Sequence, residues 1–410
     1  MGEWVGWTHE FWTKRAFCCR IRARLLFDRA MLECLVALNS LPKIGPVRIR
    51  RLLDAFGSAE AILAAGKDKL MRVDGIGPEM AKVMVEWEQH CDPAAELREV
   101  EERGISLMML DDPLFPAALR DAYDAPVLLY VWGKLEERDR HAVGIVGTRR
   151  ASSYGKAATK KVAFQCAHAG FTVISGLARG IDTTAHEAAL AANGRTVAVL
   201  GSGLAKLFPA ENLGLAEKIA DGRGAVVSEY PLHTSPSKQT FPQRNRIVAA
   251  WSRALIVTES PVWSGSMITA NLASEYGRSV YAVPGPITSP TSAGCHRLIR
   301  EGATLLADGG ELLDDLGMLE LDSPRPANSA AQASDDPIPA TDTPHQERDM
   351  PELPEDEKQI FAALGSMEMG VDQLIETTGL PAASVTTNLL KLEMKRLVRP
   401  MPGFRYVRRD

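Results

Sequence analysis

Four blocks rich in Gly, Ser and Arg carry the residues whose types and spacing could do chemistry. The first, residues 147–155, places Gly147 and the adjacent Arg149 and Arg150 directly after a β-branched apolar run. Small residues let backbone N–H groups approach an anion, and guanidinium groups add charge-assisted hydrogen bonds. This block predicts an anion-binding loop. The alternative is a tight turn that needs glycine only for packing.

The second and fourth blocks offer further polar groups of the same kind. Residues 175–186 begin with Ser175 and Gly176, and Asp182 could N-cap the next helix. Asp182 and His186 could form an acid–base pair, but no nucleophile stands beside them, so catalysis is weakly supported. The fourth block contains a second candidate anion cradle at a helix N-terminus, Ser264, Gly265 and Ser266.

The third block, residues 237–248, combines basic side chains with an aromatic ring. Phe241 lies among Lys238, Arg244, Asn245 and Arg246. Charges that follow phosphates and a ring that stacks a base suit single-stranded nucleic acid. The alternative is that Phe241 is core and that the arginines pair with Glu229 or Glu259, and Arg246 is the residue most expected to be internal.

Several enzyme classes lose their sequence support. The chain has neither G-x-G-x-x-G nor G-x-x-x-x-G-K-[ST], so dinucleotide binding and a P-loop are not expected. The serines of the fourth block do not form G-x-S-x-G, so a serine hydrolase is not expected. The sequence predicts no catalytic residue, no metal site and no cofactor.

The elements that must position these blocks read as alternating strands and helices. Short apolar β-branched runs alternate with helical stretches from residue 106 to 318, the pattern of a doubly wound sheet. We expect α/β architecture: an extended Rossmann-like fold with parallel strands, whose strand-end loops hold the four blocks. The runs lie at 127–131, 142–146, 171–174, 196–200, 225–227, 254–257 and 280–283, and the helices include 155–169, 183–192 and 267–276.

The flanking segments predict two appended modules. In residues 1–105, two Gly-containing hairpins at 41–46 and 73–78 each open an amphipathic helix, as in a helix-hairpin-helix domain. Residues 358–410 read as three helices and a β-hairpin, a winged helix. The segment between, 319–357, is Pro-rich and acidic and is expected to be a linker.

Charge is distributed unevenly along the 410 residues. The net charge is −5, yet residues 320–357 alone carry eleven acids and two arginines, −9, which leaves +4 for the rest. A local basic groove is therefore compatible with a pI near 6.0.

Six cysteines without a C-x-x-C pair fit a reducing cytoplasm. No apolar run reaches the roughly 18 residues of a membrane span, the N-terminus lacks a secretory signal, and Met31 is a candidate alternative start.

Together the four blocks resemble the DprA/Smf family of DNA-processing proteins. The matching patterns are G-T-R-x-x-S-x-Y-G at 147–155, S-G-L-A-R-G-I-D-x-x-A-H at 175–186, F-P-x-R-N-R-I at 241–247 and S-G-S-x-I-T-A at 264–270. The resemblance implies a non-enzymatic cytoplasmic protein that binds incoming single-stranded DNA, protects it and helps load RecA during natural transformation. It also implies a homodimer formed through the Rossmann-like domain.

Carried over by motif, the resemblance places Arg149, Lys238 and Phe241 at the DNA-binding pocket. His296 departs from the family pattern, which usually has Asn there. Two rival functions stay open: a Rossmann-type nucleotide-monophosphate phosphoribohydrolase, whose P-G-G-x-G-T-x-x-E signature is missing after Pro284-Gly285, and a winged-helix transcription regulator. The helix-hairpin-helix could contact DNA, or its glycines could only shape the fold. The winged helix could bind duplex DNA or dock a partner.

Overall fold

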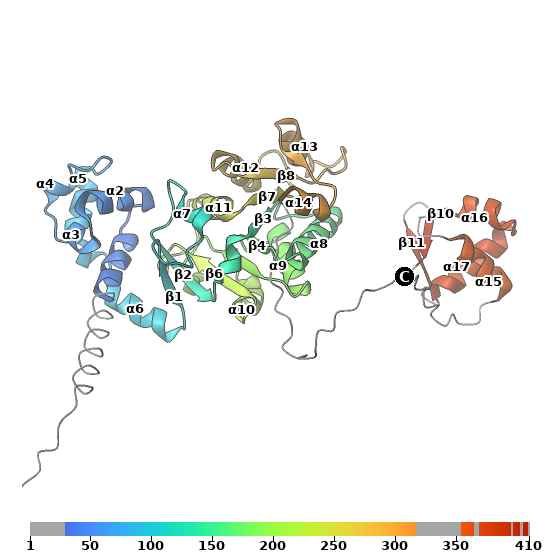
Figure 1. The fold of residues 1–410 in the computed structure, drawn as a ribbon, viewed down its shortest axis with the longest axis horizontal. Helices are drawn as coiled ribbons and strands as arrows, with labels where there is room; N and C mark the ends of the chain where they lie inside the picture. The colour runs from blue at the N-terminus through green and yellow to red at the C-terminus, as the bar shows by residue number, and fades with distance from the viewer. Residues whose placement is uncertain (1–28, 317–353, 365–368, 395–396, 402–404, 409–410) are drawn as a thin grey trace, which may run out of the picture. The chain divides into compact units, whose positions relative to one another are not determined.

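The computed structural model describes residues 29–316, 354–364, 369–394, 397–401 and 405–408 (Figure 1). The chain divides into two compact units, Met1–Arg325 and Pro326–Asp410. The predicted linker at 319–357 lies almost entirely outside the described residues, as does the N-terminal segment 1–28.

Helices come first along the chain in the larger unit. Residues 29–40 are helical and are followed by α2 (Pro46–Phe56), α3 (Ala59–Leu63), α4 (Lys67–Leu70), α5 (Pro78–Val85) and α6 (Pro93–Glu102). Proline opens both α2 and α5, where its missing N–H costs no hydrogen bond. The left-handed residue of the first hairpin is Lys43 (φ 68°), and that of the second is Gly75 (φ 83°). The glycines that directly precede the helices, Gly45 and Gly77, have negative φ.

A nine-stranded sheet forms the centre of this unit. Its order is β1-β2-β6-β5-β4-β3-β7-β8-β9, and every pairing from β6 to β9 is parallel. The strands are β1 (Ser106–Met109), β2 (Leu128–Gly133), β3 (Ala142–Val146), β4 (Thr172–Ser175), β5 (Thr196–Val199), β6 (Gly224–Ser228), β7 (Ala254–Val257), β8 (Ser279–Ala282) and β9 (Thr304–Leu305).

Helices cover both faces of the sheet. Successive side chains of a strand point to opposite faces, so each strand contributes apolar side chains to both helical layers. In β3, Ala142 and Val146 join the cluster that packs under α7 (Ala117–Arg120), α11 (Thr240–Trp251), α12 (Gly265–Glu275) and α13 (Ala293–Arg300). Val143 and Ile145 join the cluster under α8 (Ser153–His168), α9 (Ile181–Ala191) and α14 (Gly309–Leu316). The expected Rossmann-like α/β architecture with a helical module and a winged helix is therefore confirmed.

Two details of the expected sheet were wrong. Strands β1 and β2 are antiparallel to their neighbours, so the sheet is mixed. A buried apolar run reads alike in either direction, and the direction of β2 depends on its pairing with the distant β6. The third block, expected as a strand-end loop, lies mostly in α11.

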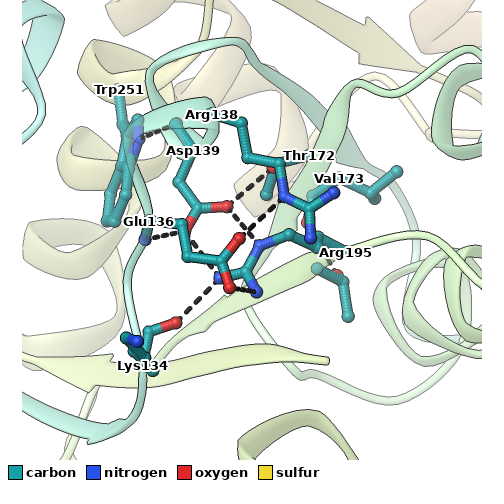
Figure 2. A network of polar contacts seen from close by, with 9 residues as sticks. Lys134, Glu136, Arg138, Asp139, Thr172, Val173, Arg195 and Trp251 are labelled. Atoms are coloured by element: carbon teal, nitrogen blue, oxygen red, sulfur yellow. Dashed lines mark hydrogen bonds and ion pairs between the residues drawn. The ribbon is translucent and has the colours of Figure 1, made fainter. Parts of the chain in front are cut away.

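A buried polar network fixes the amino ends of the central strands (Figure 2). The Asp139 carboxylate accepts hydrogen bonds from Arg195 Nε at 2.9 Å, from Arg195 Nη2 at 2.8 Å and from Thr172 Oγ1 at 2.8 Å. The Trp251 indole N–H donates to the Asp139 carbonyl at 2.9 Å. Because the polar groups of this network have hydrogen-bond partners, it ties α11 to the amino ends of β4 and β5.

The smaller unit has its own hydrophobic core. Helices α15 (Glu355–Ala363), α16 (Val371–Thr378) and α17 (Ala382–Met394) pack with a three-stranded sheet ordered β10-β12-β11. The strands are β10 (Met369–Gly370), β11 (Val398–Met401) and β12 (Arg405–Arg408). Ile360, Leu374 and Leu389 are fully buried in this core.

Candidate functional site

The carboxyl ends of β3, β4 and β7 surround a pocket of about 430 Å³. From β3 the chain moves through β4, β5 and β6 on one side and returns to β7 on the other, so strand order reverses between β3 and β7. Ligands of open α/β sheets bind at such a switch point. The described lining residues are Val146, Gly147, Thr148, Arg149, Arg150, Ala178, Asp182, Arg244, Asn245, Pro261, Trp263, Ser264, Gly265, Ser266 and Thr269.

The loop after β3 packs against Ile181 and Glu259, and its arginines are exposed to solvent. A Cβ at Gly147 would lie 2.5 Å from Ile181 and 2.7 Å from the Glu259 carbonyl, so only glycine fits there. Thr148 N–H donates to the Glu259 carbonyl at 2.7 Å, and Ser152 N–H donates to the Glu259 carboxylate at 2.8 Å. Arg149 and Arg150 are exposed on this loop. Glu259 thus positions the loop backbone and pairs with neither of the two arginines.

The loop after β4 is closed by Asp182, which does not N-cap α9 as expected. Gly180 precedes the helix, and Asp182 lies in its first turn. Its Oδ2 accepts N–H groups of Gly176 at 3.1 Å and of Ala178 at 3.3 Å. Burial raises the pKa of the Asp182 carboxyl, and the nearby Arg244 guanidinium opposes that rise. Ser175 is buried beneath the loop and donates to the Ile145 carbonyl at 2.6 Å.

The first turns of α11 bring the third block over the strand ends. Arg244 is 4% exposed, and its Nη1 donates to the carbonyls of Gly176 and Val199. Burial lowers the pKa of this guanidinium, and the positive charge of Arg149 adds to that effect. Asn245 Nδ2 donates to the Gly265 carbonyl at 3.4 Å and so bridges α11 and α12.

Arg246 faces away from the pocket. It forms an ion pair with the Glu229 carboxylate and donates to the Asp124 carbonyl at 2.6 Å. The sequence alone allowed an alternative to DNA contact, in which internal arginines pair with Glu229 or Glu259. Arg246 fits that alternative, because it is buried and pairs with Glu229. Glu229 is itself buried, so the pair compensates two charges that water does not reach.

Arg149 also contacts the aromatic part of the third block. Its guanidinium carbon lies 5.2 Å from the centroid of the Phe241 ring, and the Phe208 ring lies 5.8 Å beyond, tilted by 50°. Phe241 is half-buried and Phe208 is exposed, while Lys238 is exposed on the segment before α11. The Lys238 ammonium group and the rings of Phe241 and Phe208 therefore form a basic and aromatic surface beside the pocket.

Serine hydroxyls order the start of α12. Ser264 is the N-cap and accepts the Met267 N–H at 3.4 Å. The hydroxyls of Ser260, Ser264 and Ser266 lie 2.7 to 2.9 Å from one another. Gly265 is exposed at the pocket rim, so its backbone is open to a ligand.

The structure brings eight of the thirteen predicted site residues to the pocket and leaves five outside it. Ser175, Gly176 and Arg246 support the site from within, whereas Lys238 and Phe241 lie on the surface beside it. Gly147, Arg149, Arg150, Arg244, Asn245, Ser264, Gly265 and Ser266 line it. The sequence prediction missed Trp263, which directly precedes Ser264 at the rim, and Phe208, which packs on Phe241.

Two histidines of the blocks have structural surroundings. His186 is fully buried and shares a hydrogen bond of 2.6 Å with Thr196, and burial lowers the pKa of its imidazole to about 3. His296, in α13, lies 2.9 Å from the Gly285 carbonyl and can donate to it. Within the described residues, no group of three potential ligands could hold a metal ion. No described helix is both long and apolar enough for a membrane span.

Three family models match the chain in order. They are the SAM-like helix-hairpin-helix tandem at residues 35–86, DNA recombination-mediator protein A at 106–317 and the DprA winged helix domain at 344–403. The sheet and the pocket fall within the second match, and most of the smaller unit falls within the third.

Individual relatives agree with these models. The chain is 35% identical to Protein Smf of Synechocystis sp. over 393 residues, which cover 91% of this chain and 98% of that one. It is 42% identical to DNA processing protein DprA of Streptococcus pneumoniae over 219 residues, 53% of this chain and 77% of the relative. The X-ray structure of DprA from Streptococcus pneumoniae superposes with a TM-score of 0.60 at 34% identity, covering 68% of this chain and 95% of that chain. The resemblance noted in the four blocks is thereby confirmed, and the chain belongs to the DprA/Smf family, that of DNA recombination-mediator protein A.

Proposed function

We propose that the protein binds single-stranded DNA across the pocket at the β3–β7 switch point. The observation that carries this proposal is the contact of the Arg149 guanidinium with the Phe241 ring, 5.2 Å apart, at the edge of the pocket. A cation and an aromatic face side by side offer one group to a phosphate and the other to a base.

The charges around the pocket favour an anionic ligand. Arg149 and Arg150 are exposed at its rim, and the buried Arg244 lies beneath them. Asp182 is the single carboxylate among the described lining residues, and backbone N–H groups already occupy one of its oxygens. The excess positive charge suits the phosphates of a nucleic acid.

The aromatic groups favour a single strand over a duplex. The rings of Phe241 and Phe208 can stack only on bases whose faces are free, and duplex bases are already stacked on their neighbours. Lys238, exposed close to Phe241 in sequence, can follow the backbone of the same strand.

Binding without catalysis is the second part of the proposal. Asp182 and His186 are both buried, and His186 is engaged with Thr196 on β5. A phosphoribohydrolase would need a carboxylate or nucleophile that faces the sugar, and Asp182 instead holds the β4 loop closed.

Family membership supports the cellular part of the proposal. We infer that the protein is cytoplasmic, that it protects incoming strands during natural transformation and that it helps load RecA on them. We also infer that it acts as a homodimer through the Rossmann-like domain.

The proposal is tested by measuring the affinity of the full chain for labelled oligo-dT and for a duplex of equal length at several salt concentrations. We expect oligo-dT to bind more tightly and the logarithm of its affinity to fall linearly with the logarithm of salt concentration. A preference for duplex with a particular sequence would instead support a winged-helix regulator, and release of free base from a nucleotide would support the hydrolase.

A further inference from the structure

Trp263 is an exposed tryptophan at the rim of the pocket. Its side chain is 89% exposed, which makes it the most exposed aromatic residue in the described part of the chain. Tryptophan has a large apolar surface, so a solvent-facing indole is costly unless a ligand or partner covers it. Trp263 lines the same pocket as Arg149 and Arg150.

The backbone that carries Trp263 is held in place although the indole is exposed. The next residue, Ser264, N-caps α12, and its hydroxyl lies 2.7 Å from Ser260 and 2.9 Å from Ser266. These contacts fix Ser264, directly after the tryptophan, and Ser260, three residues before it. The backbone beside the indole is therefore anchored, and the ring itself is open to a ligand.

Trp263 and Phe241 lie at different strand ends. Phe241 covers Gly201, just after β5, because a Cβ on that glycine would lie 2.9 Å from the phenyl ring. Trp263 follows β7, and β4 and β3 separate β5 from β7. Three strand spacings amount to about 14 Å, whereas stacked neighbouring bases are about 3.4 Å apart. Rings carried at strand ends this far apart would contact different nucleotides, and the loop that carries Arg149 and Arg150 follows β3, which lies between β5 and β7.

We propose that Trp263 stacks a second base of the bound single strand, on the β7 side of the pocket. This inference rests on the proposed function and extends the site beyond Phe241. The strand runs from the Phe241 ring past the Arg149 and Arg150 guanidinium groups to the indole, with its phosphates at the arginines and its bases on the rings.

The test separates stacking from charge by comparing oligo-dT with an abasic strand of the same length. Trp263→Ala is expected to weaken oligo-dT binding by about 5- to 150-fold, the range for one base–aromatic stack, and to leave abasic-strand binding unchanged. Trp263→Phe is expected to recover most of the affinity. Wild-type indole fluorescence is expected to fall on oligo-dT binding, and that fall is expected to be smaller in Trp263→Phe.

Ile287→Ala is the matched control, because Ile287 is 92% exposed and does not line the pocket. Equal losses on both strands in Trp263→Ala, or no loss on either, would overturn the inference. A change in the sedimentation of the DNA-free protein caused by Trp263→Ala would also overturn the inference, since the indole would then belong to a contact between copies of the chain. If Arg149→Ala weakens binding and Trp263→Ala does not, only this inference fails. If wild-type protein does not prefer oligo-dT, the proposed function fails.

Discussion

Three arginines of the four sequence blocks lie in three different surroundings. Arg149 is exposed beside an aromatic ring, Arg244 is buried against two strand-end carbonyls, and Arg246 is buried against Glu229. All three carry the same charge, so the local environment alone decides which of them a ligand can reach. Of the three, only Arg149 combines solvent exposure with a neighbouring aromatic ring.

Arg149→Ala and Phe241→Ala are expected to weaken oligo-dT binding in distinguishable ways. Loss of Arg149 removes a phosphate contact, so the slope of log affinity against log salt should become shallower by about 0.7. Loss of the Phe241 ring removes a stack, so binding should weaken by about 1–3 kcal/mol with the slope unchanged. Lys238→Ala should behave like Arg149→Ala. Fluorescence anisotropy titrations at several salt concentrations measure both quantities.

Arg98→Ala serves as the control for these charge changes, since Arg98 is exposed on α6 and does not line the pocket. It should leave affinity and slope as they are in the wild type. Unchanged oligo-dT affinity in all three test variants would show that the strand lies on another surface.

At the scale of elements, helical periodicity explains what the sequence reading of the third block left undecided. The block lies mostly in α11, so Phe241 and Arg244, three residues apart, share one side of the helix, and Arg246 points to another. Both arginines are buried, and which of them lies at the pocket depends on their partners near the ends of β4, β5 and β6, which spacing alone does not encode.

Gly176→Ala is expected to disturb the site through an element contact. A Cβ there would overlap the Arg244 guanidinium, which two carbonyls hold in place. We expect a loss of about 1–3 kcal/mol in the free energy of unfolding, together with weaker oligo-dT binding. Gly214→Ala is the control, because a Cβ at this glycine of α10 (Leu213–Ala220) meets nothing within 4 Å. Denaturant titration and anisotropy test the pair, and equal behaviour of the two variants would contradict the expectation.

Helix α9 makes the fold sensitive to acid through His186. Burial lowers the pKa of this imidazole from 6.5 to about 3, so the unfolded chain binds a proton that the folded chain excludes. Stability is therefore full above pH 6.5 and falls as pH is lowered toward 3. The loss from this group should reach about 2 kcal/mol at pH 5. In His186→Gln, the drop in unfolding free energy between pH 7.5 and pH 5 should be smaller by that amount; an unchanged drop would rule out this role.

At the scale of the whole molecule, the two units contribute differently to the proposed function. Every residue that lines the pocket lies in the unit Met1–Arg325, and the winged helix has a separate core. We expect a chain ended after Arg325 to keep its affinity for oligo-dT within a few-fold, as measured by anisotropy. A tenfold loss would show that the smaller unit belongs to the binding site.

The sequence predicted the fold class and the three kinds of module because their signals are local: Gly hairpins, apolar β-branched runs and a C-terminal helix pattern. It did not predict that the helical module shares a core with the sheet. Leu38 and Ile49 of that module belong to the same cluster as Leu128 and Tyr130 of β2. Such contacts join residues far apart in the chain, as do the pairings that set the direction of β2.

The buried anchoring of Arg244 has a consequence for the time course of binding. Its guanidinium bonds hold α11 to the ends of β4 and β5, while Asn245 holds the same helix to α12. The backbone of α11 is therefore held at the pocket before any ligand arrives. If oligo-dT binds here as proposed, we expect complex formation in one bimolecular step, with a rate that rises in proportion to concentration and reaches no plateau set by a slow rearrangement.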